Sequence, residues 1–161
     1  MNKNVYNLRC KVLGKEHPDT LLSLGNLAAA YGHLGDFQKE LELEEKVYQL
    51  KCKQLGDEHT DTLLTLSNIA MTYRNLGNYE KAVEVGERAY NLRCKVLGEE
   101  HPDTLLALNN LTYAYIDLEK LKIACKLIMR YIWIIFKRWV KEKYLKIKRL
   151  ILRKNNNSNN L

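Results

Sequence analysis

One stretch of this sequence occurs three times at a constant spacing. It reads LGKEHPDTLLSLGNLAAAY from Leu13 to Tyr31, LGDEHTDTLLTLSNIAMTY from Leu55 to Tyr73, and LGEEHPDTLLALNNLTYAY from Leu97 to Tyr115. The step between copies is 42 residues, with no insertion. A constant period of this length is typical of repeat proteins, in which small units stack in a row and each unit contacts only its neighbours. The sequence therefore predicts a stacked array.

Each copy predicts a pair of helices. The first helix spans about residues 18–33, and Pro18 suits its first position, where a missing N–H costs nothing. Apolar residues then recur at spacings of three and four, the pattern of one buried helix face: Leu21, Leu24, Leu27, Ala28 and Tyr31. Gly35 is expected to end this helix and Asp36 to cap the second, as Gly77 and Asn78 do in the next unit. Neither helix can bury its apolar face alone, so adjacent units must stack.

The repeats divide the chain into units. Residues 5–14 match the ends of the later repeats, so the chain begins within a unit. We expect a leading half-unit over residues 1–13, full units over 14–55 and 56–97, and a third unit over 98–124 that diverges from the pattern. The half-unit is expected either to cap the array or to mark a fragment of a longer one.

Several residues recur together in the units: Leu24, Leu27, Ala28, Tyr31, Gly35 and Phe37 in the first, and Leu66, Ile69, Ala70, Tyr73, Gly77 and Tyr79 in the second. At these positions the chain resembles the tetratricopeptide repeat, in the 42-residue form found in kinesin light chains. The resemblance implies an all-α, helical-hairpin solenoid that needs no cofactor. It also implies a non-enzymatic scaffold or adaptor that binds a protein partner, as an extended peptide or a helix, in a concave groove. Glu40 and Glu44 depart from the pattern, because small or apolar residues are expected there, and they predict a looser first unit.

The first helices of such repeats line the concave face, so their polar residues are the candidate binding site. Asn26, Asn68 and Asn110 share one repeat position. The other candidates on this face are His33, Ser67, Met71, Arg74, Asn75, Asn109 and Tyr113. An asparagine side chain both donates and accepts hydrogen bonds, so it can pair with a peptide backbone of any sequence. The same asparagines could instead hold neighbouring helices together, and the sequence leaves both possibilities open.

The repeated linker and the cysteines predict no catalytic or metal site. His17, His59 and His101 recur once per unit, so a solenoid separates them, and no copy supplies the three or four ligands of a zinc site. A linker that starts a helix is the simpler interpretation. The four cysteines form no C-x-x-C motif, and the N-terminal residues contain no apolar signal segment. These features predict free thiols in a reducing, cytoplasmic compartment.

The C-terminal part differs in charge from the repeats. Residues 1–119 sum to −5 and residues 120–154 to +12. Residues 125–154 predict a long basic amphipathic helix, and its apolar positions Met129, Trp133, Phe136, Val140, Tyr144, Ile147 and Ile151 are expected to cover the end of the solenoid. Its basic positions include Lys137, Arg138, Lys141, Lys148 and Arg149. Residues 155–161 are asparagine-rich and predict a disordered tail.

This basic segment allows other interpretations. It could be a native cap or the product of a reading-frame change. It could also bind an anionic membrane surface or an acidic protein partner. The apolar run over residues 127–136 is too short to cross a bilayer. Nucleic acid is the less favoured partner, because no nucleic-acid recognition motif accompanies the positive charge.

Overall fold

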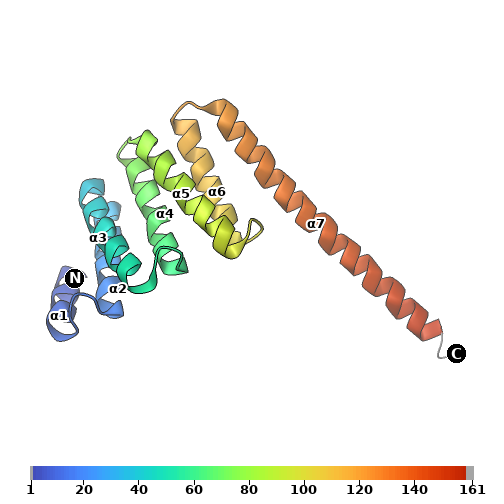
Figure 1. Ribbon diagram of the computed structural model, residues 1–161, viewed down its shortest axis with the longest axis horizontal. Helices are drawn as coiled ribbons and strands as arrows, with labels where there is room; N and C mark the ends of the chain where they lie inside the picture. The colour runs from blue at the N-terminus through green and yellow to red at the C-terminus, as the bar shows by residue number, and fades with distance from the viewer. Residues whose placement is uncertain (1, 159–161) are drawn as a thin grey trace.

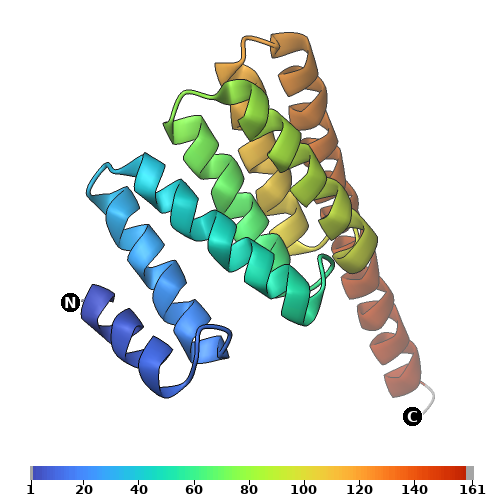
Figure 2. The same cartoon turned by 60° about the vertical axis from the view of Figure 1, so that its left-hand side comes forward.

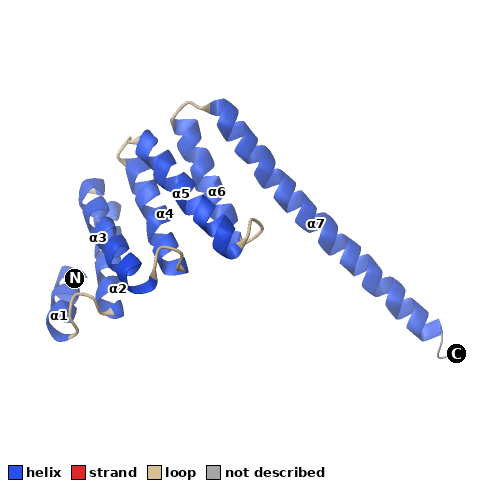
Figure 3. Cartoon of the chain, in the orientation of Figure 1, coloured by secondary structure: helices blue, strands red, loops and turns tan. Residues whose placement is uncertain are grey.

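The computed structural model describes residues 2–158, with the side chains of residues 3–149. Every element in this part is a helix, and the helices follow one another along the array in chain order (Figures 1 and 3). They are α1 (Asn2–Val12), α2 (Pro18–His33), α3 (Phe37–Leu55), α4 (Thr60–Asn75), α5 (Tyr79–Leu97), α6 (Pro102–Asp117) and α7 (Leu121–Ser158). Successive helices run antiparallel, as Figure 2 shows. The predicted all-α helical-hairpin solenoid is confirmed.

The histidine of each linker caps the helix that follows it. His17 Nδ1 accepts a hydrogen bond of 3.2 Å from the backbone N–H of Asp19 at the start of α2. His59 and His101 form the same bond at the starts of α4 and α6. The first backbone N–H groups of a helix lack partners within the helix, so each histidine satisfies one of them. The prediction that this linker starts a helix is confirmed.

The turns between paired helices follow the sequence signals. Gly35 has a φ of 78° and Gly77 a φ of 74°, the left-handed conformation that glycine adopts without steric cost. Asp36 and Asn78 cap α3 and α5 by accepting hydrogen bonds from the backbone N–H groups of Lys39 and Lys81, three residues ahead, as predicted. In the third unit Glu119 takes the same conformation, with a φ of 61°. This position therefore carries strain of about 1 kcal/mol that glycine would avoid.

A basic residue near the end of α1 and of α3 holds the next unit in register, whereas the equivalent Arg93 of α5 bonds back to Ser67 of α4. Lys51 Nζ donates hydrogen bonds to the backbone oxygen of Asp61 and to Thr65 Oγ1, both at 3.1 Å. Arg9 makes the equivalent two bonds one unit earlier, each at 2.8 Å. Because these bonds join the end of one unit to the first turn of the next, they set the offset between neighbouring units.

Two clusters of buried apolar residues lie in the interior, and α4 adds the buried Leu63, Leu66 and Ile69. The first lies between α2 and α3 and contains Leu24, Ala28, Leu43 and Val47. The second joins α5, α6 and the start of α7, and its buried members include Val83, Tyr90, Leu105, Leu108, Leu111 and Tyr115. The boundary between the two clusters lies where the first unit meets the second.

The start of α7 closes the second cluster, but through a different face from the one we predicted. Ala124 and Ile134 are buried there, and Leu127 packs beside them. The predicted stripe lies on nearly the opposite side of the helix, and its described members are exposed: Met129, Trp133, Phe136, Val140, Tyr144 and Ile147. The expected burial of that stripe is therefore wrong. A small residue at position 124 lets α7 approach α6 closely, which the bulkier residues of the stripe would prevent.

Two further expectations for this region also change. The predicted boundary at residue 125 falls inside α7, which begins at Leu121 and joins the third unit to the basic segment. The helix continues to Ser158, so residues 155–158 are helical and not part of a disordered tail. Residues 159–161 lie outside the described residues. The side chain of Ile151 does too, so its predicted place in the stripe stays a prediction.

Candidate functional site

The predicted groove residues lie on α2, α4 and α6. Two cavities of unequal size lie between these helices. The first cavity lies between α2, α3 and α4 and has a volume of about 530 Å³. Five of the ten predicted groove residues line it: Asn26, His33, Asn68, Met71 and Asn75. The second cavity lies between α4, α5 and α6 and has a volume of about 20 Å³, which is room for little more than one water molecule.

The second cavity brings together four of the predicted residues, Ser67, Met71, Arg74 and Asn110. The hydroxyl of Ser67 is buried and accepts a hydrogen bond from Arg93, so it has a structural partner. Asn110 Nδ2 lies 3.7 Å from the sulfur of Met71, which joins α6 to α4. In this part of the groove the side chains mainly connect neighbouring helices.

The remaining two predicted residues lie outside both cavities. Asn109 is exposed on α6. Tyr113 is also exposed, and the guanidinium of Arg74 lies over its ring at 5.5 Å from the centroid. Arg74 also forms an ion pair with Asp117. These contacts hold the Arg74 side chain between α4 and α6.

Two glutamates account for the larger size of the first cavity. Glu40 and Glu44 line it from α3, and the equivalent residues of α5 are Ala82 and Gly86. A Cβ atom at Gly86 would lie 3.3 Å from Leu111 Cδ1, so the small residues of α5 let α6 pack closely. The sequence identified both glutamates as departures, but we interpreted them as a loosening of the unit. Their place in the wall of a cavity was missed.

Glu44 is the most buried charged group of the first cavity. Its side chain is only 7% exposed, and Thr72 Oγ1 donates a hydrogen bond of 2.8 Å to Glu44 Oε2. Burial raises the pKa of Glu44 to about 7, against the lowering effect of the Thr72 bond, and the nearby Glu40 raises it further. Burial also raises the pKa of Glu40, and the electrostatic effect of His33 and a hydrogen bond with Thr72 partly offset this rise. Glu44 therefore changes charge near neutral pH.

Lys51 supplies the one ammonium group among the residues that line the first cavity. Its Nζ atom is engaged with Asp61 and Thr65, and burial lowers its pKa. No ion pair joins it to Glu40 or Glu44 within the described part of the chain. Among the described residues, neither carboxylate therefore forms an ion pair with a protein cation, and only an electrostatic effect of His33 reaches Glu40.

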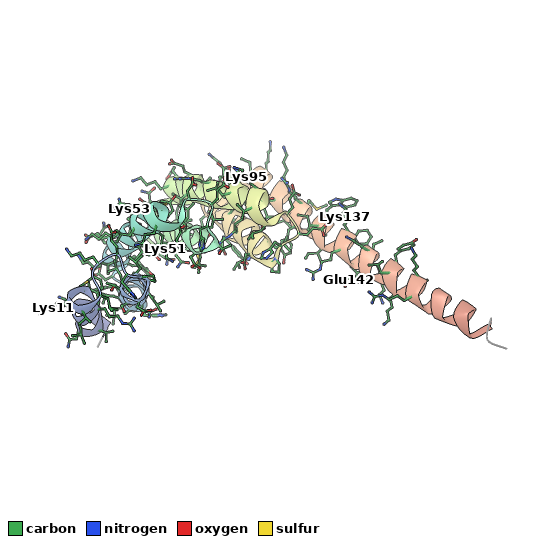
Figure 4. The ribbon with its side chains drawn as sticks, turned by 60° about the horizontal axis from the view of Figure 1, so that its bottom comes forward. Lys11, Lys51, Lys53, Lys95, Lys137 and Glu142 are labelled. Carbon is green, nitrogen blue, oxygen red and sulfur yellow. The ribbon has the colours of Figure 1, made fainter. Side chains whose placement is uncertain are left out.

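The basic positions predicted on α7 form a second candidate surface. Lys137, Arg138, Lys141, Lys148 and Arg149 are all exposed. Figure 4 places Lys137 and Glu142 on the part of α7 that extends beyond the repeats, whereas Lys51 and Lys95 lie within them. Beside the basic residues Phe136 lies between Trp133 and Trp139, with ring centroids 6.4 and 6.1 Å apart. The surface therefore combines positive charge with exposed aromatic rings.

Several other features bear on the type of site. No group of three or more metal-capable side chains occurs among the described residues. Cys10, Cys52 and Cys94 are partly buried, Cys125 is exposed, and all four are free thiols. None of the helices in the described part combines the length and the apolar character that crossing a bilayer requires.

Comparison with known proteins gives two kinds of match. The model of the family described as "Tetratricopeptide repeat" matches residues 20–61 and 62–103. The tetratricopeptide-like repeats of a protein from Podosopora anserina, described as a kinesin light chain, are similar in structure, with a TM-score of 0.73 and 32% identity. A variant of that protein gives a TM-score of 0.74 at the same identity. Each alignment covers 83% of this chain and 63% of the other.

A more distant structure shows the fold alone. BtubC (BKLC) from P. vanneervenii has a TM-score of 0.76 at 17% identity, over 83% of this chain and 53% of that chain. This chain thus spans less than two thirds of each of the three solved chains. No curated protein sequence matches it.

Proposed function

Because the chain belongs to the tetratricopeptide repeat family, in its 42-residue, kinesin-light-chain-like form, we propose that it is a non-enzymatic scaffold or adaptor that binds an extended peptide of a partner protein. The fold is generally one of protein–protein interaction. The proposed binding surface is the groove along α2, α4 and α6, with the first cavity as its main recess.

The first cavity is the observation that carries this proposal. It is open to solvent, large enough to receive side chains of a ligand, and lined by polar residues of two inner helices. Asn68 lies at its α4 wall, is exposed, and makes no side-chain hydrogen bond within the described part of the chain. Its amide can therefore pair with a peptide backbone at no cost in internal hydrogen bonds.

Substitution of Asn68 tests the proposal. A partner is first captured from cell extract and purified, and its binding to the isolated chain is measured by calorimetry. Asn68→Ala should weaken binding by about 1–2 kcal/mol, because one or two hydrogen bonds to the peptide backbone are lost. The matched control is Asn91→Ala, an exposed asparagine of α5 that lines neither cavity.

Thermal unfolding separates a binding role from a structural one. Asn68→Ala should leave the melting temperature nearly unchanged, because the amide has no hydrogen-bond partner among the described residues. A large fall in melting temperature with unchanged affinity per folded molecule would assign Asn68 to the structure and contradict the proposal.

A second candidate function rests on α7. Its exposed apolar residues lie on the side that faces away from the repeats, and basic residues flank them. Helices with aromatic residues on one face and lysine or arginine on the other bind at the interface of anionic bilayers. We propose this lipid surface in preference to nucleic acid, because phosphate contacts alone would leave Trp133 and Phe136 in water.

Vesicle binding tests this second function. The full chain should bind phosphatidylcholine vesicles only when they contain phosphatidylserine, and binding should weaken as salt rises. Two double variants should each abolish most of the vesicle binding. One is Trp133→Ser with Phe136→Ser, and the other is Lys137→Glu with Lys141→Glu. Lys53→Glu with Lys95→Glu, which changes the same charge on the repeats, is the control. Equal loss in the control, or tighter binding to duplex DNA or RNA than to vesicles, would reject the lipid assignment.

A further inference from the structure

We propose that the first cavity receives a lysine side chain of the bound peptide, whose ammonium group lies between the carboxylates of Glu40 and Glu44. This inference rests on the proposed function and specifies the chemistry of the ligand. It follows from three properties of the cavity: its volume, the burial of Glu44, and the lack of an ion pair to either acid among the described residues.

The cavity places both carboxylates where a ligand side chain can reach them. Glu40 and Glu44 are four residues apart on α3, so their side chains lie on one face of the helix, one turn apart. Both line a volume of about 530 Å³ that opens to solvent between α2 and α4. Apolar walls from Leu21, Phe37 and Val47 complete the recess. These walls suit the four-carbon stem of lysine, whose charged end would lie at the acids.

Glu40 depends on a glycine of the neighbouring helix for its position. A Cβ atom at Gly32 would overlap the carboxylate of Glu40, so the acid lies directly against the backbone of α2. In the next unit the equivalent pair is Arg74 and Ala82. There the small residue is Ala82, on the second helix. The long side chain is that of Arg74, on the first helix, and it forms an ion pair with Asp117. The space for two carboxylates therefore exists in the first unit only.

The charge of the cavity favours a cation from outside. Glu44 is more than nine-tenths buried, and a hydroxyl of Thr72 is its only hydrogen-bond donor among the described side chains. A buried carboxylate that lacks a positive partner is costly in free energy. The ammonium group of a ligand would supply that partner and would be held by two acids at once.

The geometry favours lysine over arginine. An arginine side chain binds a carboxylate best through two parallel N–H···O bonds, which need both oxygens of the acid. One oxygen of Glu44 is already bonded to Thr72. An ammonium group needs a single oxygen from each acid, so lysine can bind without displacing Thr72.

Binding should depend on pH because the acids must be ionised. The titratable or charged groups that line the cavity with Glu44 are Glu40 and Lys51 on α3 and His33 on α2, and α4 contributes Thr72, Asn68 and Asn75 but no charged group. The pKa of about 7 for Glu44 means that this acid is mostly neutral at pH 6 and mostly ionised at pH 8. Affinity for a lysine peptide should therefore rise over that interval. A His33→Asn variant, which carries the residue of the next unit, removes any contribution of His33 to this pH dependence.

Peptide selection on the full chain tests the inference. Short random peptides displayed on phage are selected at about pH 8, and the enriched peptides are synthesised with each lysine in turn replaced by norleucine or arginine. Calorimetry then measures binding of these peptides to the native chain and to the double variant Glu40→Gln with Glu44→Gln. The control is Glu42→Gln, because Glu42 is an exposed glutamate of α3 outside the cavity. Circular dichroism confirms that each variant is folded.

The expected result is a single lysine in each enriched peptide. Its replacement by norleucine should weaken binding about tenfold to a hundredfold in the native chain and in Glu42→Gln, and less than about twofold in the double variant. The inference is overturned if the peptides depend on Asn68 but tolerate norleucine, or if the loss persists in the double variant. In that case the proposed function stands. Preference for arginine overturns the choice of lysine, and a failure to select any peptide that depends on Asn68 overturns both proposals.

Discussion

The two halves of the groove are built from one repeat, yet one half is open and the other is filled. Four of the equivalent positions that differ are Gly32 and Arg74, Glu40 and Ala82, Glu44 and Gly86, and Thr72 and Ala114. In the second half the small residues of α5 admit Leu111, and α4 contacts α6 directly. In the first half the glutamates keep a cavity open and Thr72 provides the hydrogen bond that Glu44 needs. The shape and charge of the groove thus depend on a few side chains and not on the helical scaffold.

The largest effect on stability should come from placing a glutamate of the first half of the groove at the equivalent position of the second half. Gly86→Glu would force its side chain against Leu111, which is buried, and would leave a carboxylate among apolar groups. We expect a loss of about 3–5 kcal/mol in the free energy of unfolding, from overpacking and burial of an unpaired charge. Urea denaturation measures it. The control Gly86→Ala should change stability far less, and equal stability of Gly86→Glu and the native chain would mean that the two halves do not differ in packing.

The next effect concerns the charge of Glu44. Its pKa is raised from 4.5 to about 7 in the folded state, so folding favours its protonated form. Its contribution to stability is therefore complete below about pH 4.5 and is lost as the pH rises through about 7. Relative to Glu44→Gln, the native chain should lose up to about 3 kcal/mol between pH 5 and pH 8. Denaturation at a series of pH values measures this slope, and a difference that does not vary with pH would contradict it.

A smaller effect should follow from removing the donor to Glu44. Thr72→Ala should destabilise the chain by about 1–2 kcal/mol at pH 8, because a hydrogen bond to a charged group is lost. At pH 5 the loss should be smaller, since Glu44 is then neutral. Thr112→Ala is the matched control, because the hydroxyl of Thr112 bonds only to the backbone of its own helix. Equal losses for both variants at every pH would show that the Thr72 bond has no special role.

The smallest effect should be at the surface of the second half. Arg74 pairs with Asp117, and both side chains are partly exposed, so solvent screens the pair. Arg74→Ala should reduce stability by no more than about 1 kcal/mol, and added salt should reduce the difference. A double-mutant cycle with Asp117→Asn isolates the interaction of the two groups. A coupling well above this value would mean that charge, as well as packing, distinguishes the second half.

Local signals predicted most of the fold. Pro18, Gly35 and Asp36 act within a few residues of their own positions, so the bounds of α2 and the start of α3 could be read from sequence alone. The role of His17 as a cap was missed, because histidine is not among the usual capping residues. Its recurrence directly before each first helix was the available signal.

Contacts between elements were harder to predict. The periodicity of α7 indicated an apolar stripe, but periodicity in one helix does not say which face meets a neighbour. The alignment of Ala124 with Ala82 marks the correct face, because both positions face the preceding first helix. For Glu40 and Glu44 the sequence identified the unusual positions, yet the size of the space around them depends on how α2 and α4 pack. That distance is a property of the assembled array.

The open first cavity has a mechanical consequence. The side chains around it face solvent and are not packed against protein atoms on that side, so this junction resists deformation less than the junctions that are filled. Under force, the array should behave as two stiff segments joined at a more flexible junction. A ligand that fills the cavity would make this junction stiffer, and its binding would therefore set the curvature of the array. Force spectroscopy of the chain with and without a bound peptide would register the change as a higher spring constant.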